Sequence, residues 1–210
     1  MTRTQLGRPV GAIGGETRRR IIVATMNCVA RIGYSQATIR EIARMANVTS
    51  ASLYNYFPNK AELIKATIAT RNDAAMPRLR QAAQGPGNIV DRIEAVLDES
   101  GQLLREYPDL AAFEWAIRAE NLIAAGDEGH EVGNHSFETM REIIADVVAD
   151  ARRTGDLGDH LDPQAVTEAV YALLYGLTEL AATLPPADFQ AALGASKVLV
   201  RGTLFGPRAD

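Results

Sequence analysis

The hydrophobic pattern of residues 38–57 predicts two short helices joined by a tight turn. In the first helix apolar residues recur at the spacing of one helical face, at Ile39, Ile42, Ala43 and Ala46. Thr38 is of a residue type that caps helices, and Glu41 three positions later can complete a capping box. Asn47 stands where this helix should end, because asparagine tolerates the left-handed backbone of such a turn.

The second short helix has few residues that can anchor it to a core. Thr49 is its expected N-cap and Leu53 its inward-facing residue. Small, hydroxyl or amide side chains dominate the rest of this segment, at Ser50, Ala51, Ser52, Tyr54, Asn55 and Tyr56. Such groups read base edges and contact phosphates when a helix lies in the DNA major groove. The two helices therefore predict a helix-turn-helix, with an ordinary helical hairpin of an unrelated bundle as the alternative.

Charge is distributed unevenly along the chain. The net charge of all 210 residues is −4, but the segment through Lys65 carries ten lysines and arginines against three glutamates. That segment has a net charge of +7, and the remainder has −11. A basic head on an acidic body is typical of a protein whose one end binds nucleic acid.

The residues of this region resemble the signature of TetR-family transcriptional regulators. The resemblance is carried by Ile42-Ala43, Ala46-Asn47-Val48-Thr49, Leu53-Tyr54, Tyr56-Phe57 and Lys60, and it extends from Gly33-Tyr34 to Leu63. It covers about the first third of the chain. The family usually has glycine where this chain has Asn47, and a small residue where it has Ala51.

Candidate DNA contacts follow from this pattern and from the basic N-terminus. They are Arg3, Arg8, Thr38, Arg40, Thr49, Ser50, Ala51, Ser52, Tyr54, Asn55, Tyr56 and Lys60. Residues 1–16 are rich in glycine and lack a helical period, so we expect a flexible basic arm. Such an arm either enters the minor groove or stays a solvated terminus.

The rest of the chain predicts an all-α fold. The first helix should span 17–33 and end at Gly33, and the helix that follows the motif should be capped by Asn59 and run to about Pro77. Five further helices are expected at 88–106, 108–124, 134–154, 163–184 and 186–205. We expect a DNA-binding domain at 17–65 and a larger helical domain at 66–206 for effector binding and dimerisation.

The last two predicted helices are apolar around most of their circumference, which indicates burial on more than one side. A second copy of the chain would supply the further surface, and the resemblance also implies a homodimer whose two heads read a pseudo-palindromic operator. The expected interface residues are Val170, Leu174, Leu177, Ala181, Ala192, Ala195 and Leu199.

The resemblance further implies a small-molecule effector bound inside the helical body. Candidate pocket residues are Phe113, Trp115, Arg118, Phe137, Met140, Tyr171 and Tyr175, which would suit a hydrophobic or amphipathic effector. Aromatic residues at helical spacing also fill ordinary cores, so a core role is the alternative. Glu114 and Arg118 are spaced for an ion pair on one helix, either at the surface or facing a ligand.

Other classes of site have little support. His130, Glu131 and His135 lack the spacing of a helical zinc site, and no metal or cofactor is expected. The single Cys28 falls on an apolar helix face and is interpreted as a buried structural thiol. No apolar run has the length of a membrane span, and no hydrophobic leader follows the start, which favours a cytoplasmic protein, associated with the nucleoid when DNA-bound.

A ligand-responsive DNA-binding regulator, most often a repressor in families of this kind, is the interpretation that these features favour. A protein that binds DNA without sequence preference is one alternative. A helical enzyme acting on a small molecule is another, although no nucleophile–base pair or phosphate-binding loop supports it.

Overall fold

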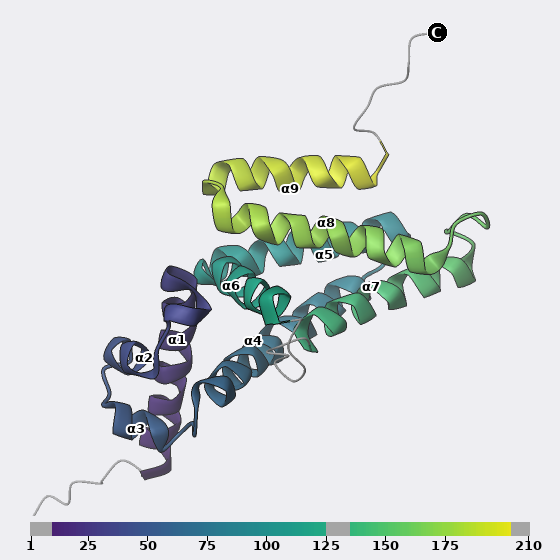
Figure 1. Cartoon of the computed structure of the whole chain (residues 1–210). Helices are drawn as coiled ribbons and strands as arrows, with labels where there is room; N and C mark the ends of the chain where they lie inside the picture. The colour runs from purple at the N-terminus through teal and green to yellow at the C-terminus, as the bar shows by residue number, and fades with distance from the viewer. Residues whose placement is uncertain (1–9, 125–134, 203–210) are drawn as a thin grey trace, which may run out of the picture.

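The computed structural model describes residues 10–124 and 135–202, and these ranges contain helices and no strand. The helices are α1 (Val10–Gln36), α2 (Ile39–Met45), α3 (Ser50–Tyr54), α4 (Lys60–Ala83), α5 (Ile89–Glu106), α6 (Asp109–Ala124), α7 (His135–Thr154), α8 (Pro163–Thr183) and α9 (Pro186–Val200). Figure 1 shows a small head of α1–α3 and a larger body, with α4 running from one to the other. The predicted all-α fold is confirmed.

The first helix is longer at its start than the sequence pattern indicates. It begins at Val10, so residues 10–16 are helical and do not belong to a flexible arm. Glycines lower helix propensity by roughly 1 kcal/mol each, but extending an existing helix costs less than starting one. Gly33 interrupts the helix with φ 78° and ψ 164°, as its predicted terminating role requires.

Pro77 does not end α4, contrary to the expectation. The helix continues to Ala83, although a proline in a helix interior removes one backbone hydrogen bond. Met76, Leu79 and Ala83 on either side of Pro77 are buried in the core of the body. Their packing explains why the helix persists, because burial of apolar side chains outweighs a local loss of this size.

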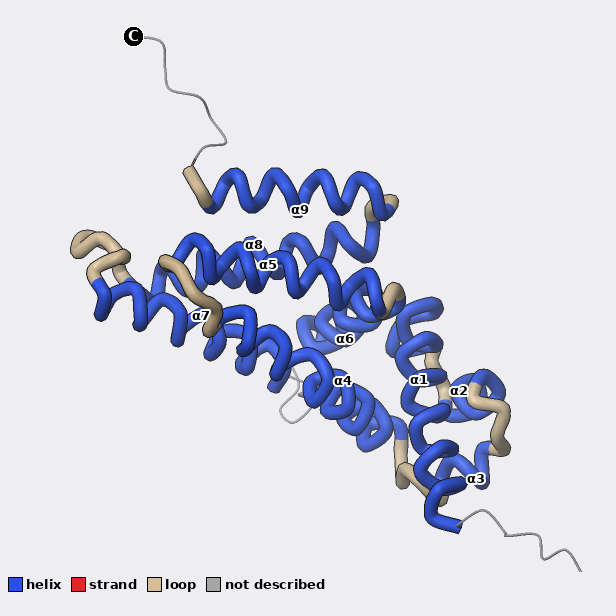
Figure 2. Tube along the Cα trace, turned by 180° about the vertical axis from the view of Figure 1, so that it is seen from behind, coloured by secondary structure: helices blue, strands red, loops and turns tan. Residues whose placement is uncertain are grey.

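Two hydrophobic cores organise the molecule, one in the head and one in the body. The head core contains Cys28, fully buried as expected, where burial raises the pKa of the thiol. It also contains Phe113 and Ile117, which belong to α6. Because α6 packs against α1 as well as α8, the head is seated on a helix of the body (Figure 2).

The C-terminal helix α9 lies along the outer edge of the body next to α8 (Figures 1 and 2). Leu193 packs directly on Gly101 of α5, where an added Cβ atom would lie 2.5 Å from the leucine Cδ2 atom. Arg201 pairs with the mostly buried Glu94, and the Lys197 ammonium lies 2.7 Å from Asp98. These contacts fix α9 to the body of its own chain.

Candidate DNA-binding surface and effector cavity

Local hydrogen bonds set the geometry of the two short helices. The Thr38 hydroxyl accepts from the Glu41 amide at 3.2 Å, and the Thr49 hydroxyl accepts from the Ser52 amide at 3.0 Å. Between the helices Asn47 adopts φ 53°, the left-handed conformation expected of it. The predicted caps and turn are therefore confirmed, and they hold α3 at a fixed angle to α2.

One predicted part of the capping box is wrong. The Glu41 carboxylate does not return to the Thr38 amide, which donates to the Gln36 carbonyl instead. The carboxylate pairs with Arg44, one turn further along the exposed face of α2. A hydrogen bond from a charged guanidinium is stronger than one from a backbone amide, so the Glu41 carboxylate binds Arg44 and not the Thr38 amide.

The helix α3 presents an open outer face to solvent. Leu53 is fully buried and anchors the helix, while the Tyr54 side chain is 53% exposed and Ala51 and Asn55 are exposed beside it. Ser50 and Ser52 are partly buried. An outer face that carries a phenol hydroxyl and an amide is suited to contacts with phosphates and base edges.

Tyr56 and Lys60 lie differently from the expectation of outward-facing contacts. Tyr56 is partly buried against the head core. The Lys60 ammonium donates to the Tyr34 carbonyl and lies 4.0 Å from the centre of the Tyr34 ring. Burial lowers the pKa of Lys60. A phosphate contact by this lysine therefore requires its ammonium to leave Tyr34.

Exposed candidate contacts lie at the starts of both α2 and α3. Thr38, Arg40 and Thr49 are exposed, while Arg3 and Arg8 lie outside the described residues. The sequence pattern did not single out an open groove of about 440 Å³ between α1 and the end of α2. Arg19 and Arg20 of α1 and Asn47 of the turn line that groove, which places two more cations near the motif.

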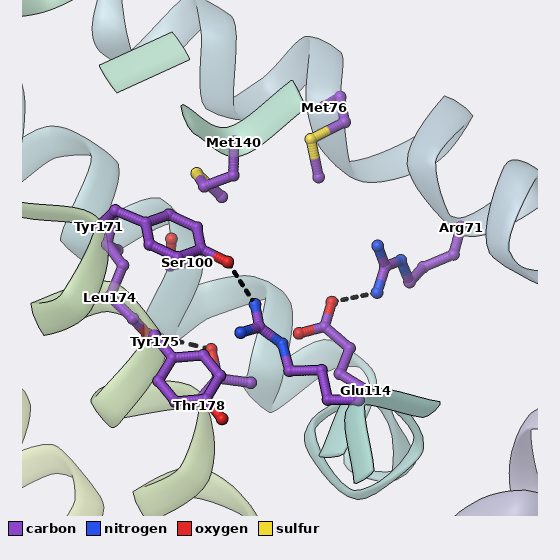
Figure 3. A pocket seen from close by; sticks show the side chains of 10 residues that line it. Arg71, Met76, Ser100, Glu114, Met140, Tyr171, Leu174, Tyr175 and Thr178 are labelled. Carbon is purple, nitrogen blue, oxygen red and sulfur yellow. Dashed lines mark hydrogen bonds and ion pairs between the residues drawn. The ribbon is translucent and has the colours of Figure 1, made fainter. Parts of the chain in front are cut away.

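A second candidate site is a small cavity inside the body (Figure 3). Its volume is about 50 Å³, and it is lined by Arg71, Met76, Ser100, Glu114, Arg118, Met140, Tyr171, Leu174, Tyr175 and Thr178. These residues come from α4, α5, α6, α7 and α8. Long-range packing alone brings them together.

Four of the seven predicted pocket residues lie at this cavity, namely Arg118, Met140, Tyr171 and Tyr175. Phe113 does not, because it is fully buried in the head core. Trp115 is 42% exposed, and its ring centre lies 6.2 Å from that of Tyr175 outside the lining. Phe137 falls in α7, but its side chain lies outside the description.

Glu114 does not pair with Arg118 on its own helix. It pairs with Arg71 of α4, and the two side chains are only 19% and 9% exposed. The Arg118 guanidinium donates to the Tyr171 hydroxyl at 2.8 Å and lies 4.0 Å from the centre of the Tyr175 ring. Arg71 was missed in the sequence, because no local pattern distinguishes it from a surface arginine of an amphipathic helix.

The predicted dimer residues divide into two groups. Leu174 and Leu177 are buried within the body core, and Val170 and Ala181 pack against it. These four residues are therefore held mainly by their own chain. Ala192 is partly buried, whereas Ala195 and Leu199 are exposed on α9.

Metal and membrane sites find no support in the described residues. Within residues 10–124 and 135–202 no group of three histidine, cysteine or acidic side chains is placed to hold a metal ion. His130 and Glu131 lie outside these ranges, and the side chain of His135 is not described. No described helix is long and apolar enough to cross a membrane.

The head and body together define a class of protein. A helix-turn-helix with an exposed second helix, carried on an all-helical body with an internal cavity, is the architecture of a DNA-binding transcriptional regulator. Comparison with known proteins agrees. Residues 21–67 match the family model for bacterial regulatory proteins of the tetR family.

Curated relatives extend the similarity into the body. The HTH-type transcriptional regulator UidR of Escherichia coli strain K12 is 21% identical over 164 residues, covering 77% of this chain and 79% of UidR. The HTH-type transcriptional repressor KstR of Mycolicibacterium smegmatis is 27% identical over 142 residues, covering 67% of each chain.

Solved structures support the fold over most of the chain. The transcriptional regulator FadR of Bacillus subtilis, solved in complex with stearoyl-CoA, superposes with a TM-score of 0.73 at 18% identity. The match covers 90% of this chain and 97% of FadR. Residues 21–67 thus carry the DNA-binding region of the tetR family, and the chain, which resembles regulators and repressors over most of its length, is a DNA-binding transcriptional regulator.

Proposed function

We propose that this regulator is a repressor that binds a pseudo-palindromic operator as a homodimer and leaves it when a small, largely hydrophobic effector enters the body cavity. One observation carries this proposal. Both α4 and α6 contribute to the head core and to the cavity lining. A change in the cavity can therefore reach the head through two helices at once.

Each of the two shared helices has some residues in the head core and others at the cavity. In α4, Leu63 and Ile64 belong to the head core, whereas Arg71 lines the cavity. In α6, Phe113 belongs to the head core and Glu114, the next residue, lines the cavity. Side chains of one helix that pack in the head core and at the cavity cannot move independently. An effector that shifts α6 therefore also shifts the surface on which the head packs.

The effector must enlarge the cavity when it binds. Ligand pockets usually hold about 300 to 1,000 Å³, and the cavity has about 50 Å³. Met76 and Met140 line it, and methionine side chains adapt readily to a new shape. FadR of Bacillus subtilis, which has this fold, was solved in complex with stearoyl-CoA, and this supports an effector with an apolar chain.

The outer surface of α8 and α9 is the proposed dimer interface. Leu184, Val198 and Leu199 are exposed there, together with alanines at helical spacing on α8, namely Ala165, Ala169 and Ala172. Two such helix pairs can form a four-helix interface about a two-fold axis. Substituting Leu199 with aspartate should give monomers in sedimentation velocity, while Leu161→Asp, at an exposed leucine of the preceding loop, should not.

Operator binding follows from the exposed surface of the head. We assign base contacts to Ser50, Ala51 and Asn55, and phosphate contacts to Thr38, Arg40, Thr49 and Tyr54. Two heads related by the dimer axis would read half-sites about 34 Å apart, roughly one turn of the double helix. The protein would act in the cytoplasm, on the nucleoid when DNA-bound, and without enzymatic activity or a cofactor.

Selection of bound duplexes from a random library at near-physiological salt tests this function. The expected result is an enriched palindrome, because each head of a dimer reads the same half-site. Binding without enrichment would instead support a protein that recognises DNA non-specifically. The enriched duplex then serves as the operator for the experiments below.

A further inference from the structure

The cavity of the body is charged as well as apolar, and its charged groups indicate what kind of effector it takes. Two guanidinium groups and one carboxylate line it, those of Arg71, Arg118 and Glu114. The lining therefore holds three charged groups in a small space. A purely hydrocarbon effector would have to share a small space with these three charges, which is costly in a low-dielectric interior.

The carboxylate of Glu114 is paired with the guanidinium of Arg71. Figure 3 shows Glu114 pointing towards Arg71, and an ion pair joins them across the side of the cavity. Arg71 also donates to the Asn72 side-chain oxygen at 2.6 Å. Since both charged side chains are largely buried, the pair is held in place mainly by mutual attraction and not by solvent.

The second guanidinium is placed over aromatic groups. Arg118 donates to the Tyr171 hydroxyl and lies over the Tyr175 ring. A carboxylate or phosphate forms stronger, charge-assisted and often bidentate hydrogen bonds with arginine than a phenol does. An anion entering the cavity would therefore have two guanidinium groups within reach from two different helices.

The remaining lining can hold the apolar part of the same molecule. Met76, Met140 and Leu174 provide adaptable or aliphatic surface on the side away from Glu114. The hydroxyl oxygen of Ser100 is buried and has no hydrogen-bond partner among the described residues. It offers one further polar contact to a ligand headgroup.

We propose that the effector is an amphipathic anion whose carboxylate or phosphate binds Arg71 and Arg118 in competition with Glu114. Glu114 is the built-in competitor, because it already holds Arg71 where the anionic group of the effector would bind. Displacing it separates α4 from α6, the two helices that enter the head core. This inference rests on the proposed function for its regulatory consequence, but anion binding itself can be measured without DNA.

Paired probes of equal shape test the charge requirement. The probes are decanoate and 4-phenylbutyrate, each compared with its neutral primary amide. We expect both acids to raise the melting temperature of the wild-type protein and to release the labelled operator in fluorescence anisotropy. Each amide should bind at least about tenfold more weakly, since it lacks the charge-assisted contact.

Variants of the lining residues sharpen the test. Arg71→Gln and Arg118→Gln should each reduce the preference for acid over amide, and Arg71→Lys should keep part of it. Arg80→Gln is the matched control, because Arg80 is a half-exposed arginine of the same helix outside this cavity. The preference of Arg80→Gln for acid over amide should equal that of the wild type.

The competitor role of Glu114 gives the most distinctive expectation. Glu114→Gln should tighten decanoate binding severalfold and weaken operator binding in the absence of any probe. A residue that merely supported the cavity would weaken both when substituted, so weaker decanoate binding by this variant would overturn the competitor role.

Failure of the proposal differs from failure of the proposed function. Equal binding of acids and amides, or no stabilisation of the wild type by either acid, would overturn the anionic effector even if a palindromic operator is bound. Stabilisation by the acids without any specific DNA binding would leave the anion site standing and contradict the repressor.

Discussion

The head and the body cavity are built in different ways. The DNA-binding surface comes from one continuous stretch, in which caps at Thr38 and Thr49, a turn at Asn47 and one anchor at Leu53 fix the geometry. The cavity takes its residues from five helices between Arg71 and Thr178. A local site can be derived from neighbouring residues, whereas a long-range site depends on how whole helices pack.

The two regions also use arginine differently. Arg18, Arg19 and Arg20 of the head are exposed, and Arg40 is exposed at the start of α2. In the body, Arg78 bridges Glu99 and Glu106 and lowers the pKa of the Glu106 carboxyl to about 2. These four arginines of the head are therefore open to phosphates, while Arg78 of the body joins α4 to α5.

Truncating Phe113, the larger of the two α6 residues in the head core, should have the largest effect. Phe113→Ala should destabilise the protein by about 3 to 5 kcal/mol, the usual cost of a large cavity in a core. Operator affinity should fall with it, although Phe113 belongs to a body helix. Thermal unfolding and anisotropy measure the two effects. Trp115→Ala is the control and should change both much less, because Trp115 is partly exposed.

Substitutions on α3 should separate sequence reading from general affinity. Asn55→Ala should cost about 1 to 3 kcal/mol at one base pair of each half-site, with little loss on other sequences. Tyr54→Phe should weaken binding to every sequence by roughly 1 kcal/mol, since a hydroxyl contact to phosphate carries no base information. Affinities for a set of single-base operator variants test this. A uniform loss for both variants would contradict the assigned geometry.

Acid titration should distinguish an ion pair of the body from one of the head. The hydrogen bonds from Arg201 hold the pKa of Glu94 below its ordinary value of 4.5, so the stabilisation is complete above that value. The stability that this ion pair gives the folded protein is lost as pH falls from 4.5 through the lowered pKa of the folded state, because the unfolded chain binds the proton more readily in that range. Glu94→Gln should therefore lower the melting temperature at neutral pH and reduce its further fall in acid.

The matched head variant is Glu41→Gln. Arg44 also lowers the pKa of Glu41, but this pair is exposed on α2, and exposed pairs contribute little to stability. Its melting temperature should follow the wild type over the whole titration. An equal effect of both variants would show that the body pair is no more important than the surface pair.

The sequence predicted the head more completely than the cavity, for physical reasons. Caps, turn and anchor in the head act over three or four residues, so their spacing can be read directly from the chain. There are three exceptions. Glu41 pairs with Arg44 and does not complete the capping box. Tyr56 and Lys60 turn inward, towards the head core and Tyr34.

In the body, the same aromatic spacing fits a core or a pocket. Phe113 shows the difficulty, because its face of α6 packs against the head while the adjacent Glu114 faces the cavity. Arg71 and Ser100 carry no local signal at all. Pro77 was overestimated as a helix end, since burial of its neighbours compensates for the lost hydrogen bond.

The most direct test of a sequence-specific regulator is its affinity for the selected operator compared with a scrambled duplex of equal length and composition. Fluorescence anisotropy at about 0.15 M salt, where non-specific binding is weakened, gives both dissociation constants. We expect the operator to bind at least about 10³-fold more tightly, the usual lower limit for specific recognition. Equal affinity for the two duplexes would contradict sequence-specific regulation by this protein.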